Sequence, residues 1–180
     1  MNITELSRIG GQTVTPTVFF LFAAAASAAI LGGALLFQFV GGLQPCPLCL
    51  YQRVPYVTVI ALGTIGGLLA WRGLLSSTAA TLIATLFALI FLTGGGIAGF
   101  HTGVEQGWWT GSTECVGAGG DAASTEELMQ AILDAPAVRC DEIAWSLFGI
   151  SLAGFNLLLS LALVAASAVV VSGWIRDARA

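Results

Sequence analysis

The chain has 180 residues, of which 57% are hydrophobic and only 9% are charged, and its formal net charge is −4. Soluble domains carry about 25% charged residues, so this composition excludes an ordinary soluble enzyme. The sequence has no lysine and no basic patch, which excludes a nucleic-acid partner. The apolar content also excludes a disordered chain. These exclusions leave an integral membrane protein, which we expect to form a single domain over residues 1–180.

Long uncharged stretches predict four membrane-spanning helices. Residues 9–52, 54–71 and 143–175 contain no ionisable side chain apart from the cysteines and tyrosines, and residues 73–104 add only His101. A helix needs about 20 apolar residues to cross a bilayer, so each stretch holds one span. The first apolar stretch is longer than the 7–15-residue core of a signal peptide, so we expect it to remain in the protein as a membrane helix and not to be cleaved off. The predicted fold is an all-α four-helix membrane bundle with spans over residues 17–40, 54–71, 77–99 and 144–173.

The arginines predict the orientation of the bundle. With four spans, four of the six arginines fall on one side: Arg8, Arg72, Arg176 and Arg179. Positive residues favour the cytoplasmic side, so both termini are expected there, in a bacterial inner membrane. The other, periplasmic side then receives two loops, residues 41–52 and 101–142. The longer loop contains eight acidic residues and only one arginine.

The longer loop also contains the signature of a short helix. Ser124 and Glu127 have the spacing of a capping box, and Pro136 must end any helix that follows. Such a helix is too short to be stable alone, so we expect it to rest on membrane lipid or on a partner. A simple surface helix is an equally good interpretation.

Two pairs of glycines have the spacing that lets membrane helices approach closely: Gly63 with Gly67, and Gly95 with Gly99. Glycine is common in membrane helices, so the sequence alone favours no specific role for them.

All four cysteines fall on the periplasmic side, Cys46 and Cys49 in the short loop and Cys115 and Cys140 in the long one. This segregation indicates thiol chemistry in an oxidising compartment. Three pairings are possible. Closing the short Cys-x-x-Cys loop would contribute about 2 kcal/mol and a Cys115–Cys140 loop about 3.5 kcal/mol, so the short bridge is better suited to a switch. A structural role for the long bridge and a four-cysteine zinc site remain alternatives, with zinc less favoured.

The residues around the Cys-x-x-Cys sequence suggest how it is activated. Pro47 disfavours helical geometry at Cys46, so Cys46 should lie in a turn just outside the membrane. Cys49 would then lie near a helix N-terminus, which lowers a thiol pKa. If the helix includes Arg53, its guanidinium lies on the same face as Cys49 and favours the thiolate. Pro55 also permits a helix that begins only after Arg53, which would then be an interfacial anchor.

His101 is the only histidine, and it is expected to end the third helix on the periplasmic side. Trp108 and Trp109 follow it, as in the aromatic belt of a membrane interface. Its position on the same side as the cysteines makes a role in thiol chemistry a second interpretation.

These residues resemble the DsbB family of disulfide bond formation proteins. The resemblance lies in Pro-Cys-Pro-Leu-Cys-Leu-Tyr-Gln-Arg at residues 45–53, in the His101-containing segment 99–109, and in Cys140 before the last helix. It covers most of the chain. Members of this family form part of the DsbA–DsbB–quinone chain, which keeps the bacterial periplasm oxidising.

The resemblance implies a role for each matched residue. Cys115–Cys140 would oxidise a periplasmic thioredoxin-fold thiol oxidase of the DsbA type, with Cys115 forming the mixed disulfide. Cys46–Cys49 would re-oxidise that pair and pass electrons to ubiquinone or menaquinone, and so to the respiratory chain. Cys49 would lie next to the quinone, Arg53 would hold it, and His101 would be close by. No metal site is implied.

Two other interpretations are compatible with the residues. A non-enzymatic membrane protein would use its cysteines for structural disulfides or for a zinc site made by all four thiolates. A related four-helix enzyme would use similar cysteine chemistry on quinone epoxide-like substrates. The reaction that the purified protein catalyses distinguishes both interpretations from a quinone-linked thiol oxidase.

Overall fold

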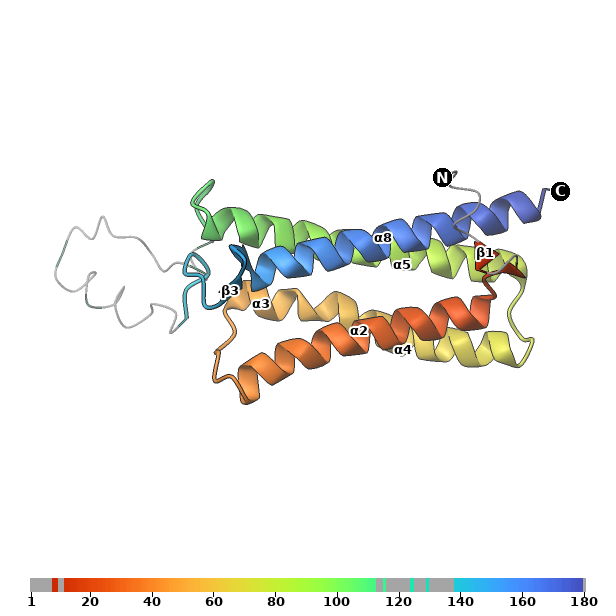
Figure 1. Ribbon diagram of the computed structural model, residues 1–180, viewed down its shortest axis with the longest axis horizontal. Coiled ribbons are helices and arrows are strands. Elements are labelled where there is room, and N and C mark those ends of the chain that lie inside the picture. Colours follow the sequence, from red (N-terminus) through yellow and green to blue (C-terminus); the bar gives the residue numbers. More distant parts are fainter. Residues whose placement is uncertain are drawn as a thin grey trace.

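The computed structural model describes residues 8–9, 12–112, 115, 124, 129 and 138–179. Long helices run side by side along one axis (Figure 1). Four of them are long and apolar enough to cross a membrane, which confirms the predicted four-helix membrane bundle. The helices are α2 (Pro16–Phe39), α3 (Pro47–Tyr51), α4 (Arg53–Trp71), α5 (Ser77–Glu105) and α8 (Leu152–Asp177). Short antiparallel hairpins are formed by β1 (Arg8–Ile9) with β2 (Gln12–Thr13) and by β3 (Ser146–Leu147) with β4 (Ile150–Ser151).

The bundle consists of two helix pairs, α2 with α4 and α5 with α8, and α4 also contacts α5 (Figure 1). Gly63 of α4 explains the first close pair, because a Cβ there would lie 2.9 Å from the backbone oxygen of Phe20. A Cβ at Gly67 would similarly lie 2.7 Å from the Leu21 side chain. The sequence alone favoured no role for this glycine pair, but the structure places both at the α2–α4 contact.

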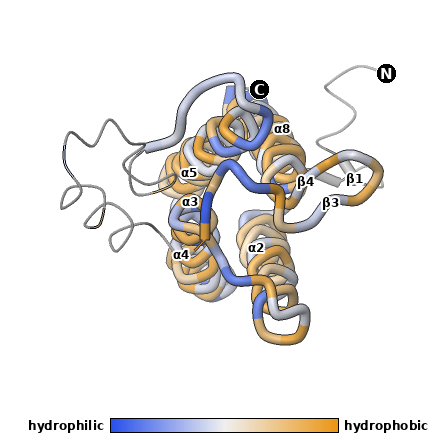
Figure 2. Tube along the Cα trace, turned by 90° about the vertical axis from the view of Figure 1, so that its left-hand side faces the viewer, coloured by the Kyte–Doolittle hydropathy of each residue, from blue (hydrophilic) through white to orange (hydrophobic). Residues whose placement is uncertain are grey.

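Aromatic rings fill the centre of the bundle. Phe20 and Phe87 are fully buried with ring centroids 5.6 Å apart, and Tyr56 packs against Phe91 with centroids 6.4 Å apart. Residues of the helices are largely hydrophobic (Figure 2), and the outer surface carries exposed apolar side chains such as Leu36, Val54 and Leu82. Threonine hydroxyls on this surface donate to the carbonyl one turn earlier, as Thr64 does to Ile60, so they carry no unpaired donor into lipid.

Two helix boundaries differ from the prediction by six residues or more. The third span was expected to end at residue 99, but α5 continues to Glu105. The last span was expected to begin at residue 144, but α8 begins at Leu152. Hydropathy alone does not show that residues 144–151 lie outside the helix. In the structure most of these residues form the β3–β4 hairpin. Phe148 and Gly149 both have positive φ, at 53° and 78°, as a tight hairpin turn requires.

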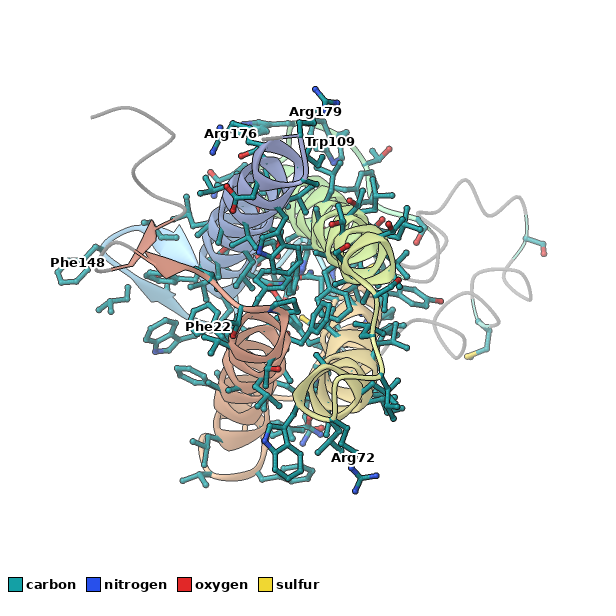
Figure 3. The ribbon with its side chains drawn as sticks, turned by 90° about the vertical axis from the view of Figure 1, so that its right-hand side faces the viewer. Phe22, Arg72, Trp109, Phe148, Arg176 and Arg179 are labelled. Carbon is teal, nitrogen blue, oxygen red and sulfur yellow. A yellow bond between two sulfur atoms is a disulfide. The ribbon has the colours of Figure 1, made fainter. Side chains whose placement is uncertain are left out.

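The two ends of the bundle are chemically different. Figure 3 faces the end at which α2 begins and α8 ends, where Arg72, Arg176 and Arg179 lie at the rim. The opposite end carries α3 and the β3–β4 hairpin (Figure 1). Phe148 projects from this hairpin with 91% of its surface exposed (Figure 3). The short helix predicted to begin at Ser124 falls mainly outside the described residues.

Candidate functional site

The Cys-x-x-Cys sequence forms the beginning of α3. Cys46 is the N-cap residue with an extended backbone (φ −74°, ψ 168°), as expected before Pro47. The backbone N–H of Cys49 donates to the Cys46 sulfur at 3.3 Å. The two sulfur atoms lie 2.9 Å apart, and both cysteines are free thiols. The local fold therefore holds the pair as a close dithiol.

The other two cysteines form a disulfide. Cys115 and Cys140 are joined with a Cα–Cα distance of 5.0 Å, and both are buried. The backbone N–H of Cys140 also donates to the Cys115 carbonyl at 2.9 Å. Next to this bridge, Arg139 donates two hydrogen bonds to Asp141, which lowers the pKa of that carboxyl group.

Tertiary packing brings the two cysteine pairs together. The Cys46 sulfur, the Cys140 sulfur and a ring nitrogen of His101 all lie within 4.8 Å of one another. Leu48 and Val104 bury this cluster among apolar side chains. Three such donors resemble part of a metal site, but the Cys140 sulfur is already bonded to Cys115. The arrangement instead suits thiol–disulfide exchange, which needs a thiolate close to a disulfide sulfur.

His101 lies inside α5, whereas the sequence led us to expect it at the helix end. Its Nε2 lies 3.6 Å from the Cys46 sulfur and 3.8 Å from Oε1 of Glu105, one turn further along. Its Nδ1 lies 2.8 Å from Nε2 of Gln52. Of the two interpretations, the contact with Cys46 favours a role in thiol chemistry over a belt residue.

These contacts include polar residues that sequence reasoning missed. Gln52 is the one residue between α3 and α4, and it also accepts a hydrogen bond from Asn156 of α8. Ser151 donates to Glu105. If the third helix had been predicted to continue to residue 105, the sequence would have indicated a contact between His101 and Glu105, because residues four apart are neighbours on a helix. No sequence signal links Asn156 to Gln52, since only the packing of α8 brings them together.

The local electrostatics favour a thiolate at Cys46. A hydrogen bond with the Cys49 thiol lowers the pKa of Cys46 to about 4, and His101 contributes in the same direction. Burial opposes this shift but is the smaller influence. We expected the helix N-terminus to activate Cys49. In the structure Cys46 caps the helix, so the backbone N–H of Cys49 is directed at the Cys46 sulfur. The helix N-terminus therefore stabilises a thiolate at Cys46.

Arg53 is the first residue of α4, and its side chain is directed towards α2. Its guanidinium Nη1 donates to Oε1 of Gln38 at 2.7 Å. No hydrogen bond joins Arg53 to Cys49, although both residues are described. The structure therefore places Arg53 near the dithiol along the chain, but directs its charge towards α2.

An apolar cavity of about 610 Å³, open to the outer face of the bundle, lies between α3–α4 and α5. Leu48 lines the cavity and also belongs to the cysteine cluster, against which Ile97, another lining residue, is packed. Its volume is within the range of small-molecule sites, and a mostly apolar lining is typical of them. The remaining lining residues are Tyr51, Val54, Pro55, Thr93, Gly96 and Phe100.

Comparison with known proteins agrees with this site. Residues 16–170 match the family model for disulfide bond formation protein DsbB. Disulfide bond formation protein B 1 of Pseudomonas aeruginosa is 30% identical over 86% of this chain and 94% of that protein. The disulfide bond formation protein B of Methylococcus capsulatus is 42% identical over 46% of this chain and 45% of its own length. No solved structure matches the chain.

The family match spans the four long helices almost completely and includes both cysteine pairs. The chain therefore belongs to the DsbB family.

Proposed function

We propose that this protein is a quinone-linked protein thiol oxidase that re-oxidises a periplasmic DsbA-type thiol oxidase. The observation that carries the proposal is the position of the Cys46 dithiol sulfur within 4.8 Å of the Cys140 disulfide sulfur. Two redox-active pairs at this separation form a relay, and family membership supports disulfide formation as its purpose.

The proposed exchange moves two electrons between the pairs. A reduced partner first attacks Cys115, and resolution of the mixed disulfide leaves Cys115 and Cys140 as thiols and the partner oxidised. The Cys140 thiolate then attacks the Cys46 sulfur of a Cys46–Cys49 disulfide, and Cys49 leaves. The Cys115 thiolate attacks Cys140, and Cys46 leaves. The products are a Cys115–Cys140 disulfide and a Cys46/Cys49 dithiol, the same bonding state that the structure contains.

The lowered pKa of Cys46 supports the last step of this exchange. A thiol of low pKa is a good leaving group in disulfide exchange. The contacts of Cys46 with Cys49 and His101 stabilise it as a thiolate once it is released. The relay would therefore favour transfer of electrons towards the membrane pair.

A quinone, ubiquinone or menaquinone, would accept the two electrons and two protons of the dithiol and become a quinol. The apolar cavity beside Leu48 supports an acceptor of this class, because quinones are lipid-soluble and the cavity adjoins the cysteine cluster. In this proposal Cys49 faces the quinone and His101 lies close by. Arg53, which does not line the cavity, would turn from Gln38 of α2 to stabilise a reduced quinone oxygen. The respiratory chain would then re-oxidise the quinol.

The proposed location is the bacterial inner membrane with both termini in the cytoplasm. Arg72, Arg176 and Arg179 lie at the bundle end opposite the cysteine cluster, which supports a periplasmic position for the cluster (Figure 3). Oxidising conditions there would maintain the proposed chemistry.

The test uses purified protein with a reduced DsbA-type partner, and quinone reduction is followed by its absorbance. We expect turnover with the native chain and none with Cys46→Ser. The matched variant Cys115→Ser should lose turnover driven by the partner but keep quinone reduction driven by dithiothreitol, which can reduce Cys46–Cys49 directly. Unchanged turnover in Cys46→Ser would refute the mechanism.

The same preparation tests the non-enzymatic alternative. Bound zinc is measured by elemental analysis, and thiols are counted before and after mild reduction. One zinc per chain held by four reduced cysteines, with no quinone reduction, would replace the relay by a structural metal site.

A further inference from the structure

A chain of polar side chains runs from the cysteine cluster into the membrane-spanning part of the bundle. It begins at Cys46, passes through His101 of α5 and Gln52 between α3 and α4, and continues to Asn156 of α8 and Tyr56 of α4. Ser160 follows, 2.9 Å from the Tyr56 hydroxyl. Gln52, His101 and Ser160 are buried and Tyr56 is 3% exposed. Buried polar groups of this kind need partners, so their donors and acceptors must match.

The orientations of the two amide groups give the direction of each hydrogen bond. The Tyr56 hydroxyl donates to Oδ1 of Asn156, so the Asn156 amide nitrogen is directed at Gln52. It donates to Oε1 of Gln52, which leaves the Gln52 nitrogen facing His101. An amide nitrogen can only donate, so Nδ1 of His101 must accept and carries no proton. The neutral ring then carries its proton on Nε2.

The other side of the His101 ring agrees with this tautomer. Nε2 faces the Cys46 sulfur at 3.6 Å and Oε1 of Glu105 at 3.8 Å. A thiolate and a carboxylate oxygen are both acceptors, so a proton on Nε2 has two possible partners there. The opposite tautomer would direct a lone pair at both groups and would favour a protonated Cys46.

We propose that Gln52, Asn156 and Tyr56 are positioning residues that hold His101 as its Nε2–H tautomer, with the proton facing the Cys46 sulfur. None of the three touches a sulfur atom in this scheme, and each acts through His101. The inference rests on the proposed function in that Cys46 is the sulfur released in the relay. Its consequence is that a hydroxyl group on α4 helps to set the charge state of a cysteine beyond the helix.

The first test observes the tautomer directly. Because His101 is the only histidine in the chain, nitrogen-15 labelling of histidine gives two ring signals that need no further assignment to a residue. Their shifts distinguish a protonated from an unprotonated ring nitrogen. In the dithiol form at neutral pH we expect a proton on Nε2 and none on Nδ1. A proton on Nδ1 with a bare Nε2 would overturn the proposal.

The second test measures the pH profile of Cys46 alkylation in the reduced protein, read at the Cys46 peptide by mass spectrometry. Among the residues that the structure describes, the titratable groups around this sulfur are the Cys49 thiol and His101, with Glu105 beyond the ring. Gln52→Leu should raise the midpoint by about one to two pH units, the size expected for loss of a hydrogen bond to a charged group. Tyr56→Phe keeps the ring and should raise it by less.

Ser167→Ala is the matched control, because this buried hydroxyl of α8 bonds only within its own helix, to the Leu163 carbonyl. It should leave the midpoint unchanged. An unchanged midpoint in Gln52→Leu would refute the positioning role, and if that variant fails to fold, Tyr56→Phe decides in the same way. Neither measurement uses quinone or partner, so failure of the inference is distinguishable from failure of the proposed function.

Discussion

The sulfur atoms of Cys46 and Cys140 lie within 4.8 Å of each other, although the two residues belong to different inter-helix segments. Each already has a closer sulfur neighbour, Cys49 for Cys46 and Cys115 for Cys140. The four sulfurs therefore form a continuous series in which Cys46 and Cys140 are the inner members. Such an order gives electrons one direct path between the two pairs.

Removing the outer member of each pair should trap a bond between the inner members. In the double variant Cys49→Ser with Cys115→Ser, mild oxidation should join Cys46 to Cys140, because no other thiol competes. Mass spectrometry of unreduced peptides detects the bridge. The variant Cys46→Ser with Cys115→Ser retains Cys49 and Cys140 and should give a lower yield. Equal yields in both variants would contradict the order of sulfurs.

The reactivity of Cys46 should persist in acid. Its pKa is lowered to about 4, and only the thiolate reacts with alkylating agents. The thiolate predominates above the pKa, so the alkylation rate of Cys46 should stay nearly constant down to about pH 5 and fall as the pH approaches 4. An ordinary thiol, with a pKa of about 8.5, would lose reactivity below about pH 8. A midpoint near that value at Cys46 would contradict this prediction.

Loss of the Arg53 charge should weaken quinone binding. We expect Arg53→Ala to raise the KM for quinone about ten-fold, because a hydrogen bond to a charged group contributes about 1.5–3 kcal/mol. Exchange between the two disulfides should remain near normal. Arg72→Ala, at the other end of the bundle, is the control. An unchanged KM in Arg53→Ala would return Arg53 to the role of an interfacial anchor.

Filling the apolar cavity tests where the quinone lies. A Cβ at Gly96 would meet no atom within 4 Å, so Gly96→Leu should fold normally while occupying the cavity. We expect a several-fold higher KM for quinone with unchanged exchange between disulfides. Leu92→Phe, at an exposed position of the same helix outside the cavity lining, serves as the control. If only Arg53→Ala changes the KM, the quinone lies on the α2 side of α4 instead.

The close contact between α2 and α4 should depend on Gly63. An added methyl group would lie 2.9 Å from the Phe20 carbonyl oxygen and 3.1 Å from the Ala24 side chain, so Gly63→Ala should destabilise the bundle by about 1–3 kcal/mol. Gly33→Ala adds a methyl group to α2 that meets nothing within 4 Å and should not destabilise it. Denaturation in detergent compares the two variants with the native chain. Equal stability of both would show that the contact tolerates expansion.

Periodicity and charge predicted the number of helices well and their ends less well. The error at the start of α8 arose because residues 144–151 contain no charged side chain, and only the backbone at Phe148 and Gly149 reveals a turn. The error at the end of α5 concealed the pairing of His101 with Glu105. Both errors concern helix ends, where hydropathy changes gradually but backbone geometry changes at one residue.

The sequence by itself determined that the chain is a four-helix membrane protein, because few charges in long apolar runs permit no other stable arrangement in a bilayer. It also placed four cysteines on one side and suggested their chemistry through the Cys-x-x-Cys spacing. Only the tertiary structure decided which sulfur faces which, and that Cys46 has the lowered pKa. The sequence did not predict the polar contacts of His101 either, because helix packing, and no local sequence pattern, brings Gln52 and Asn156 together.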